Sequence, residues 1–434
     1  MAPSPPSAPA SPASRRAGSA ARMALWVLLG INLLNYLDRQ VLYALLPLIK
    51  TAFNATDTQL GALASAFMLV YMCAAPPIGW LADRSSRKGW ISFGVGFWSL
   101  ATVFSGLGRS YAQLFAARAA VGIGESCYGS VSPSFVAEHY PKERRGRVLA
   151  LFSMAVPVGS ALGYILGGVL GHLFGWRAAF FVAGIPGLLL SAAALTLVDP
   201  RERHGPHPTL SRTAGEGTTP TASIWAEYRK LAANRSWLFC TLGMAAMTFG
   251  MGAMAVWMPT FYHRTWNLDV GRAGTLFGTV TVLAGLVGSL AGGWLADKRL
   301  PRDPAAYFTV SGLGLLAAVP FAGWAVTTPR LPAAVVGRFI AETCAFLNMG
   351  PLNAVIVAVT PERVRSTAFA ANIFFIHLLG DAVSPTLVGM VSDAAGLRAG
   401  VLLAIAALAA AGAICLWGTR TFAADEAAVE IGYA

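Results

Sequence analysis

Twelve predominantly apolar runs, each about 20 residues or longer, limit this chain to a membrane-spanning fold. A helix needs about 20 such residues to cross the hydrocarbon core of a bilayer. Inside that core every backbone polar group has to find its partner within the protein, so repeated runs predict helices. We expect an all-α membrane protein with twelve transmembrane helices, at approximately 23–49, 59–82, 89–107, 111–136, 148–173, 178–198, 237–262, 273–296, 305–326, 331–359, 367–391 and 399–418.

The composition agrees with a membrane protein and changes how the positive charge is interpreted. Only 12% of the residues are charged and 56% are hydrophobic, whereas soluble domains carry about 25% charged residues. A net charge of +12 would indicate nucleic-acid binding in a soluble protein. Here Lys and Arg lie in short gaps between apolar runs, mostly on the side of the N-terminus, where they set orientation. We expect no nucleic-acid partner, and both termini on the cytoplasmic side of a bacterial-type inner (plasma) membrane.

The sequence carries no pattern typical of an enzyme or a metal site. Its five cysteines lie singly inside apolar runs, without the spacing of a disulfide framework or a metal site. It has no metal-spaced His cluster, no GxSxG motif and no GxxxxGK motif. We therefore expect a monomer with no enzymatic activity, no cofactor and no metal.

A longer polar gap divides the chain into two halves that repeat. The motif GWLAD begins at Gly79 and again at Gly293, at the end of the second run of each half, and PKERRGR from Pro141 is echoed by PERVRST from Pro361. These echoes indicate parallel repeats related by an axis along the membrane normal. The expected units are a disordered tail rich in Pro, Ser and Ala at 1–22, a six-helix bundle at 23–198, a cytoplasmic linker at 199–235, a second six-helix bundle at 236–418 and a tail at 419–434.

Ionisable residues inside four of the runs mark a candidate functional site. A charge at the bilayer centre costs about 2.5–3.5 kcal/mol on insertion scales, so such residues are rare and usually functional. We expect them to meet in one polar site between helices. They fall in the first, fourth, tenth and eleventh runs and are Asp38, Arg39, Arg118, Glu125, Arg338, Glu342, His377 and Asp381.

The spacing of these residues predicts their partners. Asp38 and Arg39 are adjacent, so they point about 100° apart on a helix and serve different partners. Three pairs, spaced by four or seven residues, each share a helix face: Arg118 with Glu125, Arg338 with Glu342, and His377 with Asp381. One hypothesis is a fixed ion-pair network that only holds helices together. The hypothesis that we favour is a pocket in which Asp38 and Glu125 exchange protons as their partners move, while an arginine holds an anion.

Several stretches around these residues form motifs. They are NYLDR, GWLADRSSRK, RAAVGIGE, GIGESCYGSVSP, PVGSALGYILGG, WMPTFYHR, ETCAFLN and HLLGDAVSP. GWLADRSSRK and RAAVGIGE resemble signatures of the major facilitator superfamily, and the other stretches resemble its Spinster family. The resemblance implies two six-helix bundles in the major facilitator fold, and secondary transport by alternating access.

The resemblance also implies roles for single residues. The chain departs from animal Spinster proteins at Met349, where they tend to have Trp, so the substrate stays open. Proton coupling would fall to Asp38, Glu125 and Asp381, and gating to Asp83, Arg84, Arg145 and Asp297. Substrate binding would fall to Tyr36, Arg39, Arg118, Ser132, Trp257, Glu342, Asn348 and His377.

We expect a proton-coupled transporter of an amphiphilic anion, such as a lysophospholipid or a sphingoid-type lipid. Arg39 would hold the anionic head and apolar residues the tail. The alternative is a transporter of a small organic anion, a sugar acid or carboxylate. A cavity with a wide apolar sector favours the amphiphile, and a compact, wholly polar cavity favours the small anion. A non-transporting receptor is a third hypothesis, but it would need a signalling domain that we do not expect here.

Overall fold

The expectation of an all-α protein is confirmed. The computed structural model describes residues 12–82, 84–199, 229, 231–361 and 364–431, and no β-strand occurs among them. The first half contains α1 (Pro12–Phe53), α2 (Asp57–Ala82), α3 (Arg87–Leu107), α4 (Tyr111–Gly129), α5 (Ser132–Glu138), α6 (Lys142–Ser153), α7 (Ala155–Phe174) and α8 (Trp176–Leu195). The second half contains α11 (Arg235–Trp266), α12 (Val270–Arg299), α13 (Ala306–Thr327), α14 (Leu331–Phe346), α15 (Pro351–Ala358), α16 (Arg365–Ile376), η2 (His377–Asp381), α17 (Ser384–Ala395) and α18 (Leu397–Ile431).

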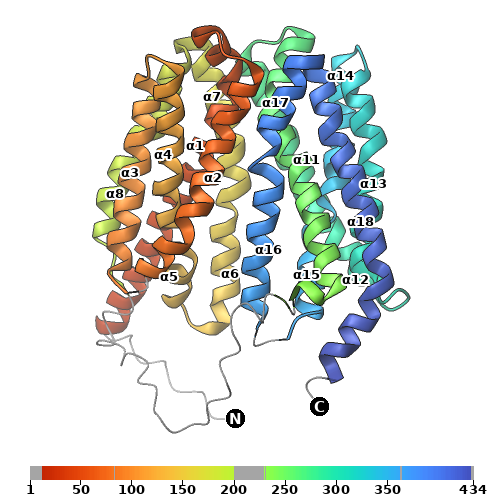
Figure 1. Ribbon diagram of the computed structural model, residues 1–434. Helices are drawn as coiled ribbons and strands as arrows, with labels where there is room; N and C mark the ends of the chain where they lie inside the picture. The colour runs from red at the N-terminus through yellow and green to blue at the C-terminus, as the bar shows by residue number, and fades with distance from the viewer. Residues whose placement is uncertain (1–11, 83, 200–228, 230, 362–363, 432–434) are drawn as a thin grey trace, which may run out of the picture.

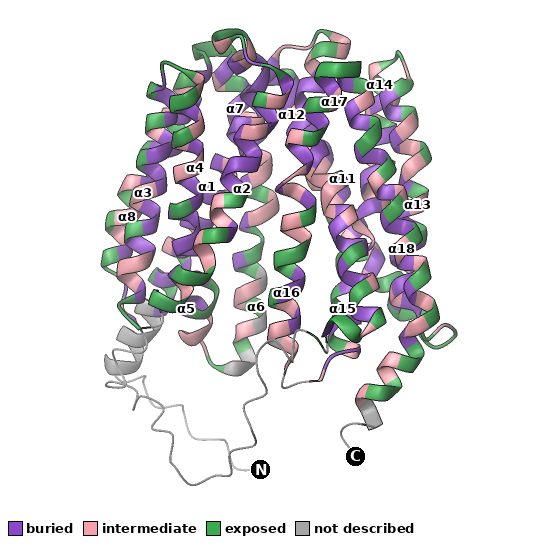
Figure 2. Ribbon diagram, viewed as in Figure 1, coloured by how far each residue is buried: buried purple, intermediate pink, exposed green. Residues whose placement is uncertain are grey.

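The two halves stand side by side as upright helical bundles (Figure 1). The start of α1 and the end of α18 lie at the same end of the molecule, which we call the terminal end. Large apolar side chains are exposed on the outer faces, Leu189 by 73% and Leu290 by 77%, and exposed residues follow the outside of both bundles (Figure 2). Such faces are typical of contact with lipid.

Ten stretches of the described helices are long and apolar enough to cross a membrane. The first and fourth expected runs, in α1 and α4, are not among the ten. Their hydropathy is lowered by the charges expected to form the site, Asp38 and Arg39 in α1 and Arg118 and Glu125 in α4. Both helices nevertheless run along the first bundle beside their neighbours (Figure 1).

Four of the expected runs are broken in the structure. The fourth divides into α4 and α5, and the tenth into α14 and α15; a proline stands in the first turn of each second segment, where it is favoured. The fifth divides into α6 and α7. The eleventh contains the π-helical turn η2, in which Gly380 has φ −99° and ψ −107°. The breaks fall at equivalent places in the two halves, which supports the repeat.

The two halves also end in the same way. Gly175 joins α7 to α8 and Gly396 joins α17 to α18, with φ of 82° and 86°. Glycine adopts this left-handed region without steric cost, so it permits the sharp reversal between the last two helices of each half.

The ends of the chain are more helical than expected. Helix α1 begins at Pro12, within the tail 1–22, and α18 continues to Ile431, within the tail 419–434. Ala and Arg, which favour helix, are frequent in 12–22. Residues 1–11 and most of the linker 199–235 lie outside the described part of the chain.

The halves make close contact at the end opposite the terminal end. A Cβ atom on Gly389 of α17 would lie 2.4 Å from Asp57 O of α2, and one on Gly274 of α12 would lie 2.4 Å from Tyr164 O of α7. Only glycine allows this approach of two backbones.

An ion cluster joins the halves at this opposite end. The Asp57 carboxylate accepts hydrogen bonds from Arg264 at 2.6 and 2.7 Å, from Lys50 at 2.5 Å and from Ser392 at 2.5 Å. The Asp393 carboxylate accepts from the backbone N–H groups of Asp57 and Thr58, both at 2.8 Å. A residue of the second half therefore caps the N-terminus of α2 in the first. We call Lys50, Asp57, Arg264, Ser392 and Asp393 the Asp57 cluster.

Candidate substrate site

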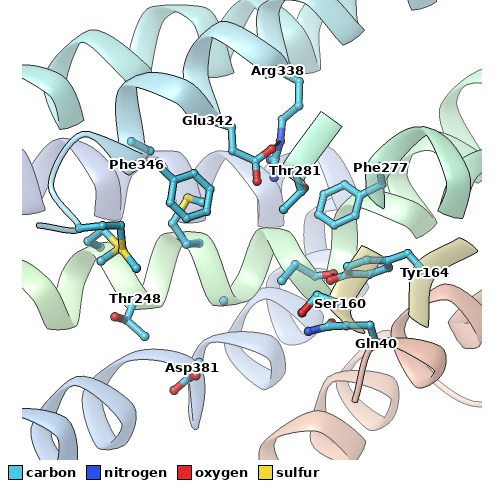
Figure 3. Close-up of a pocket in the computed structure, with 16 residues that line it drawn as sticks. Gln40, Ser160, Tyr164, Thr248, Phe277, Thr281, Arg338, Glu342, Phe346 and Asp381 are labelled. Atoms are coloured by element: carbon cyan, nitrogen blue, oxygen red, sulfur yellow. Dashed lines mark hydrogen bonds and ion pairs between the residues drawn. The ribbon is translucent and has the colours of Figure 1, made fainter. Parts of the chain in front are cut away.

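Two hollows of about 300 Å³ each lie between the halves. We name each by its arginine. The Arg39 hollow is lined by residues of α1, α2, α11, η2 and α17, and the Arg338 hollow by residues of α1, α7, α11, α12, α14 and η2 (Figure 3). The two hollows are neighbours, because four residues line both: Gln40, Gly252, Ala255 and Asp381.

Arg39 is the charged centre of the first hollow. Its Nε donates to Glu125 Oε2 at 2.6 Å. Its guanidinium also lies over the rings of Tyr36, Phe67 and Tyr71, with Cζ 5.2, 4.9 and 5.2 Å from their centroids. Aromatic faces stabilise a cation that has left water. Arg39 therefore faces the hollow while staying paired to an acid behind it.

Glu125 and Asp38 lie behind the hollow rather than in its wall. Both are about 1% exposed, as is Arg118. Asp38 accepts from Thr102 Oγ1 at 2.6 Å and from Arg118 Nη1 at 3.1 Å, and Glu125 Oε1 has no partner among the described residues. The expectation that Asp38 and Arg39 serve different partners is confirmed. The expected meeting of all the charges in one open site is only half correct, because these three are enclosed by packed helices.

The second half carries its own ion pair. Arg338 Nε donates to Glu342 Oε2 at 3.0 Å within α14, as the spacing predicts. Arg338 Nη1 also contacts Met254 Sδ at 3.0 Å, and the guanidinium lies 5.1 Å from the centroid of the Phe277 ring. Both Arg338 and Glu342 line the Arg338 hollow.

His377 and Asp381 form the third predicted pair, and they do so across the π-helical turn. His377 Nδ1 lies 2.9 Å from Asp381 Oδ1, and both residues line the Arg39 hollow. A π-helical turn inserted in a helix is frequent at functional sites. Here η2 places His377 in the Arg39 hollow and Asp381 where the two hollows meet.

Four of the predicted substrate residues lie outside both linings. Arg118, Ser132 and Asn348 are about 1% exposed, and Trp257 is fully buried. Trp257 Nε1 donates to Pro385 O at 2.9 Å, so this side chain holds α11 against α17. Tyr36, by contrast, lines the Arg39 hollow as expected.

Three of the four residues expected in the gate lie in the described part of the chain, and within it no hydrogen bond or ion pair joins them. Arg84 Nη1 donates to Trp80 O at 3.1 Å, and Arg145 Nε donates to Tyr140 O at 3.0 Å. Both hydrogen bonds lie within the first half. Asp297 is exposed. The fourth expected residue, Asp83, lies outside the described residues.

Comparison with known proteins identifies the family. The Major Facilitator Superfamily matches residues 28–385. The chain belongs to this superfamily. Protein spinster homolog 1 from Homo sapiens is 34% identical, over 85% of this chain and 72% of that protein. The sphingosine-1-phosphate transporter SPNS2 from Danio rerio is 33% identical, over 83% of this chain and 74% of that one.

The fold comparison agrees. The chain is similar to the crystal structure of a bacterial homologue of the human lysosomal transporter Spinster, in an inward-facing and unoccupied conformation, with a TM-score of 0.82. The two are 26% identical, and the match covers 94% of this chain and 98% of that one. The protein is therefore a Spinster-type membrane transporter and not an enzyme.

Some residues in the hollows of this Spinster-type transporter were not selected from the sequence. Tyr43, Phe67 and Tyr71 line the Arg39 hollow, but aromatic residues in an apolar run give no signal of their own. Gln40 lines both hollows, but one neutral polar residue next to the charged Asp38 and Arg39 gives no separate signal.

Proposed function

We propose that this transporter moves an amphiphilic anion together with a proton by alternating access. The observation that carries the proposal is the Arg39–Glu125 pair. The arginine faces the hollow, whereas the acid is enclosed behind it, and one of its carboxylate oxygens has no hydrogen-bond partner among the described residues. Proton-coupled binding of an anion requires a basic group whose charge is neutralised by an acid until that acid takes up a proton. Arg39 and Glu125 form such a pair.

The coupling follows from charge balance. While Glu125 is ionised, it neutralises Arg39, and an anion entering the hollow meets no net positive charge. When Glu125 is protonated, its attraction for Arg39 falls and the guanidinium is free to hold an anionic head. In a site of low dielectric, an unpaired charge is costly, so proton and anion stabilise each other's binding.

The walls favour an amphiphile over a small organic anion. Met247, Met251 and Met349 line the Arg338 hollow together with the rings of Phe277 and Phe346. Methionine is flexible and polarisable, so it adapts to chains of different shape. A lysophospholipid or sphingoid-type lipid would place its head at Arg39 and its tail against this wall. SPNS2 from Danio rerio, named as a sphingosine-1-phosphate transporter, is a relative that supports the lipid class.

Alternating access would use the contacts between the halves. The Asp57 cluster and the α7–α12 contact hold the opposite end closed in this conformation. If the termini are cytoplasmic, as the Lys and Arg distribution indicates, this conformation corresponds to the inward-facing state named for the bacterial homologue. Binding of substrate and proton at the centre would then close the terminal end and open the opposite end.

The test is transport by purified protein in liposomes. Uptake of a lysophospholipid and of a sugar acid would be measured with and without an inward proton gradient. We expect gradient-driven accumulation of the lysophospholipid in the wild type. In Glu125→Gln we expect exchange to continue and accumulation to be lost, whereas Glu426→Gln, outside both hollows, should behave as the wild type. Accumulation that survives in Glu125→Gln would show that proton coupling lies elsewhere.

A further inference from the structure

The second arginine of the cavity has no role in the coupling described above. The guanidinium of Arg338 carries five N–H donors. Within the described part of the chain, Nε contacts Glu342 and Nη1 contacts only a methionine sulfur, which is a weak acceptor. Nη2 has no hydrogen-bond partner there. Arg338 therefore retains donor capacity at the wall of a hollow.

Two further polar atoms of the same hollow lack protein partners. Gln40 Oε1 and Thr281 Oγ1 are buried and unpaired among the described residues, and both side chains line the Arg338 hollow. Figure 3 shows Thr281 beside the Arg338–Glu342 pair, with Gln40 on the facing wall. Buried polar groups are almost always hydrogen-bonded, so unpaired ones around a cavity indicate a site for a ligand group or water.

The internal repeat explains why this arginine faces the cavity. Arg338 is the equivalent of Arg118 in the internal repeat. Arg118 precedes Arg145 of the PKERRGR motif by the same interval at which Arg338 precedes Arg365 of the PERVRST motif. Arg118 is paired across helices with Asp38 of α1. In the second half, Met254 of α11 contacts the arginine instead, and the acid comes from α14 itself. The second half therefore has an arginine at the equivalent position, but no acid of a neighbouring helix among the described residues encloses Arg338 as Asp38 encloses Arg118.

Charge decides which ligand group fits. Glu342 neutralises Arg338, so the hollow does not favour a second anion. It offers a donor in Arg338 and acceptors in Glu342 and Gln40. A hydroxyl group, which both donates and accepts, satisfies this set, whereas a carbonyl or an alkyl chain does not.

We propose that the Arg338 hollow is a second substrate subsite, which recognises a hydroxyl group next to the anionic head held at Arg39. This inference rests on the proposed function and narrows its substrate to hydroxyl-bearing amphiphilic anions. Arg338, Gln40 and Thr281 determine specificity, and the methionine wall beside them takes the apolar chain.

The test compares two ligands that differ in one group. Binding of lysophosphatidate and of its analogue without the glycerol hydroxyl would be measured by titration of the purified protein in nanodiscs. We expect the wild type to prefer the hydroxylated ligand by roughly tenfold, the effect of one hydrogen bond to buried groups. In Thr281→Val the preference should fall at least severalfold, while affinity for the analogue stays unchanged.

Matched variants separate recognition from structure. Thr281→Val removes a hydroxyl that has no hydrogen-bond partner among the described residues, so a purely structural role predicts no loss. Thr343→Val is the control, because its hydroxyl likewise has no partner in the described part of the chain but lies outside both hollows. Arg338→Met combined with Glu342→Gln leaves no unpaired charge and should abolish the preference.

The outcomes are distinct. Equal affinity of the wild type for the two ligands, or a preference unchanged in Thr281→Val, overturns the subsite while leaving the proposed function standing. If the wild type binds neither ligand, the proposed amphiphile function fails, and the subsite fails with it.

Discussion

At the scale of residues, the ionisable groups divide into sealed and cavity-facing sets. Asp38, Arg118 and Glu125 are enclosed, whereas Arg39 and Asp381 face the hollows. Spacing along a helix predicted the Arg338–Glu342 and His377–Asp381 pairs, because residues four apart share a face. Arg118 and Glu125 instead pair with Asp38 and Arg39 of α1. Spacing did not predict which ionisable side chains are enclosed between helices and which face a hollow. That depends on how each helix is oriented about its own axis against its neighbours. Trp257 shows the same limit, because its motif matched but its ring is fully buried.

The enclosed Asp38–Arg118 pair leads to a stability prediction. Removing one partner of a buried ion pair leaves a charge uncompensated, at a cost of about 3–5 kcal/mol. We expect Asp38→Asn to lower the free energy of unfolding by that order, and Asp38→Asn combined with Arg118→Gln to recover most of the loss. Thermal unfolding in detergent measures both. A single variant as stable as the wild type would show that the pair is open to water.

At the scale of helices, the sequence predicted where the apolar runs lie but not where they break. Each run reads as continuous because proline and glycine are common in membrane helices. The structure divides the fourth, fifth, tenth and eleventh runs, and one break forms η2 with His377 and Asp381. Nothing in the sequence linked Asp57 to Arg264 or Asp393, because contacts between halves depend on docking rather than on periodicity.

The cap that Asp393 places on α2 gives a prediction at this scale. Replacing Asp393 by alanine removes both acceptor oxygens from the N–H groups of Asp57 and Thr58, which should cost about 1–2 kcal/mol. We expect Asp393→Ala to raise the population open at the opposite end by roughly tenfold. The readout is labelling of an Ala64→Cys variant, in a Cys73→Ser background, by an impermeant maleimide added at that side.

A control at the same end has the same charge change. Asp269 caps α12 within its own half by accepting from Arg272 N–H at 2.8 Å. Asp269→Ala should therefore leave the labelling rate unaltered. Equal labelling rates in Asp393→Ala and Asp269→Ala would show that the Asp57 cluster does not hold the opposite end closed.

At the scale of the whole molecule, the two halves repeat one plan with different chemistry. Gly175 and Gly396 close equivalent reversals, and Arg118 and Arg338 stand at equivalent positions. The GWLAD echo was enough to predict the repeat. We propose proton coupling for the first half and hydroxyl recognition for the second. This proposal needed the geometry, because it depends on whether an acid of a neighbouring helix encloses the arginine.

The central claim is that a shared cavity opens to alternate ends as proton and substrate bind. The most direct measurement is the distance between two spin labels by double electron–electron resonance, in a Cys73→Ser background. One pair of labels is attached to cysteines at Ser134 and Val357 at the terminal end, and the other to cysteines at Arg109 and Arg330 at the opposite end. On acidification with lysophospholipid, we predict that the first distance shortens while the second lengthens, and that Glu125→Gln is insensitive to pH. Distances that stay fixed, or that change in the same direction, would contradict the account.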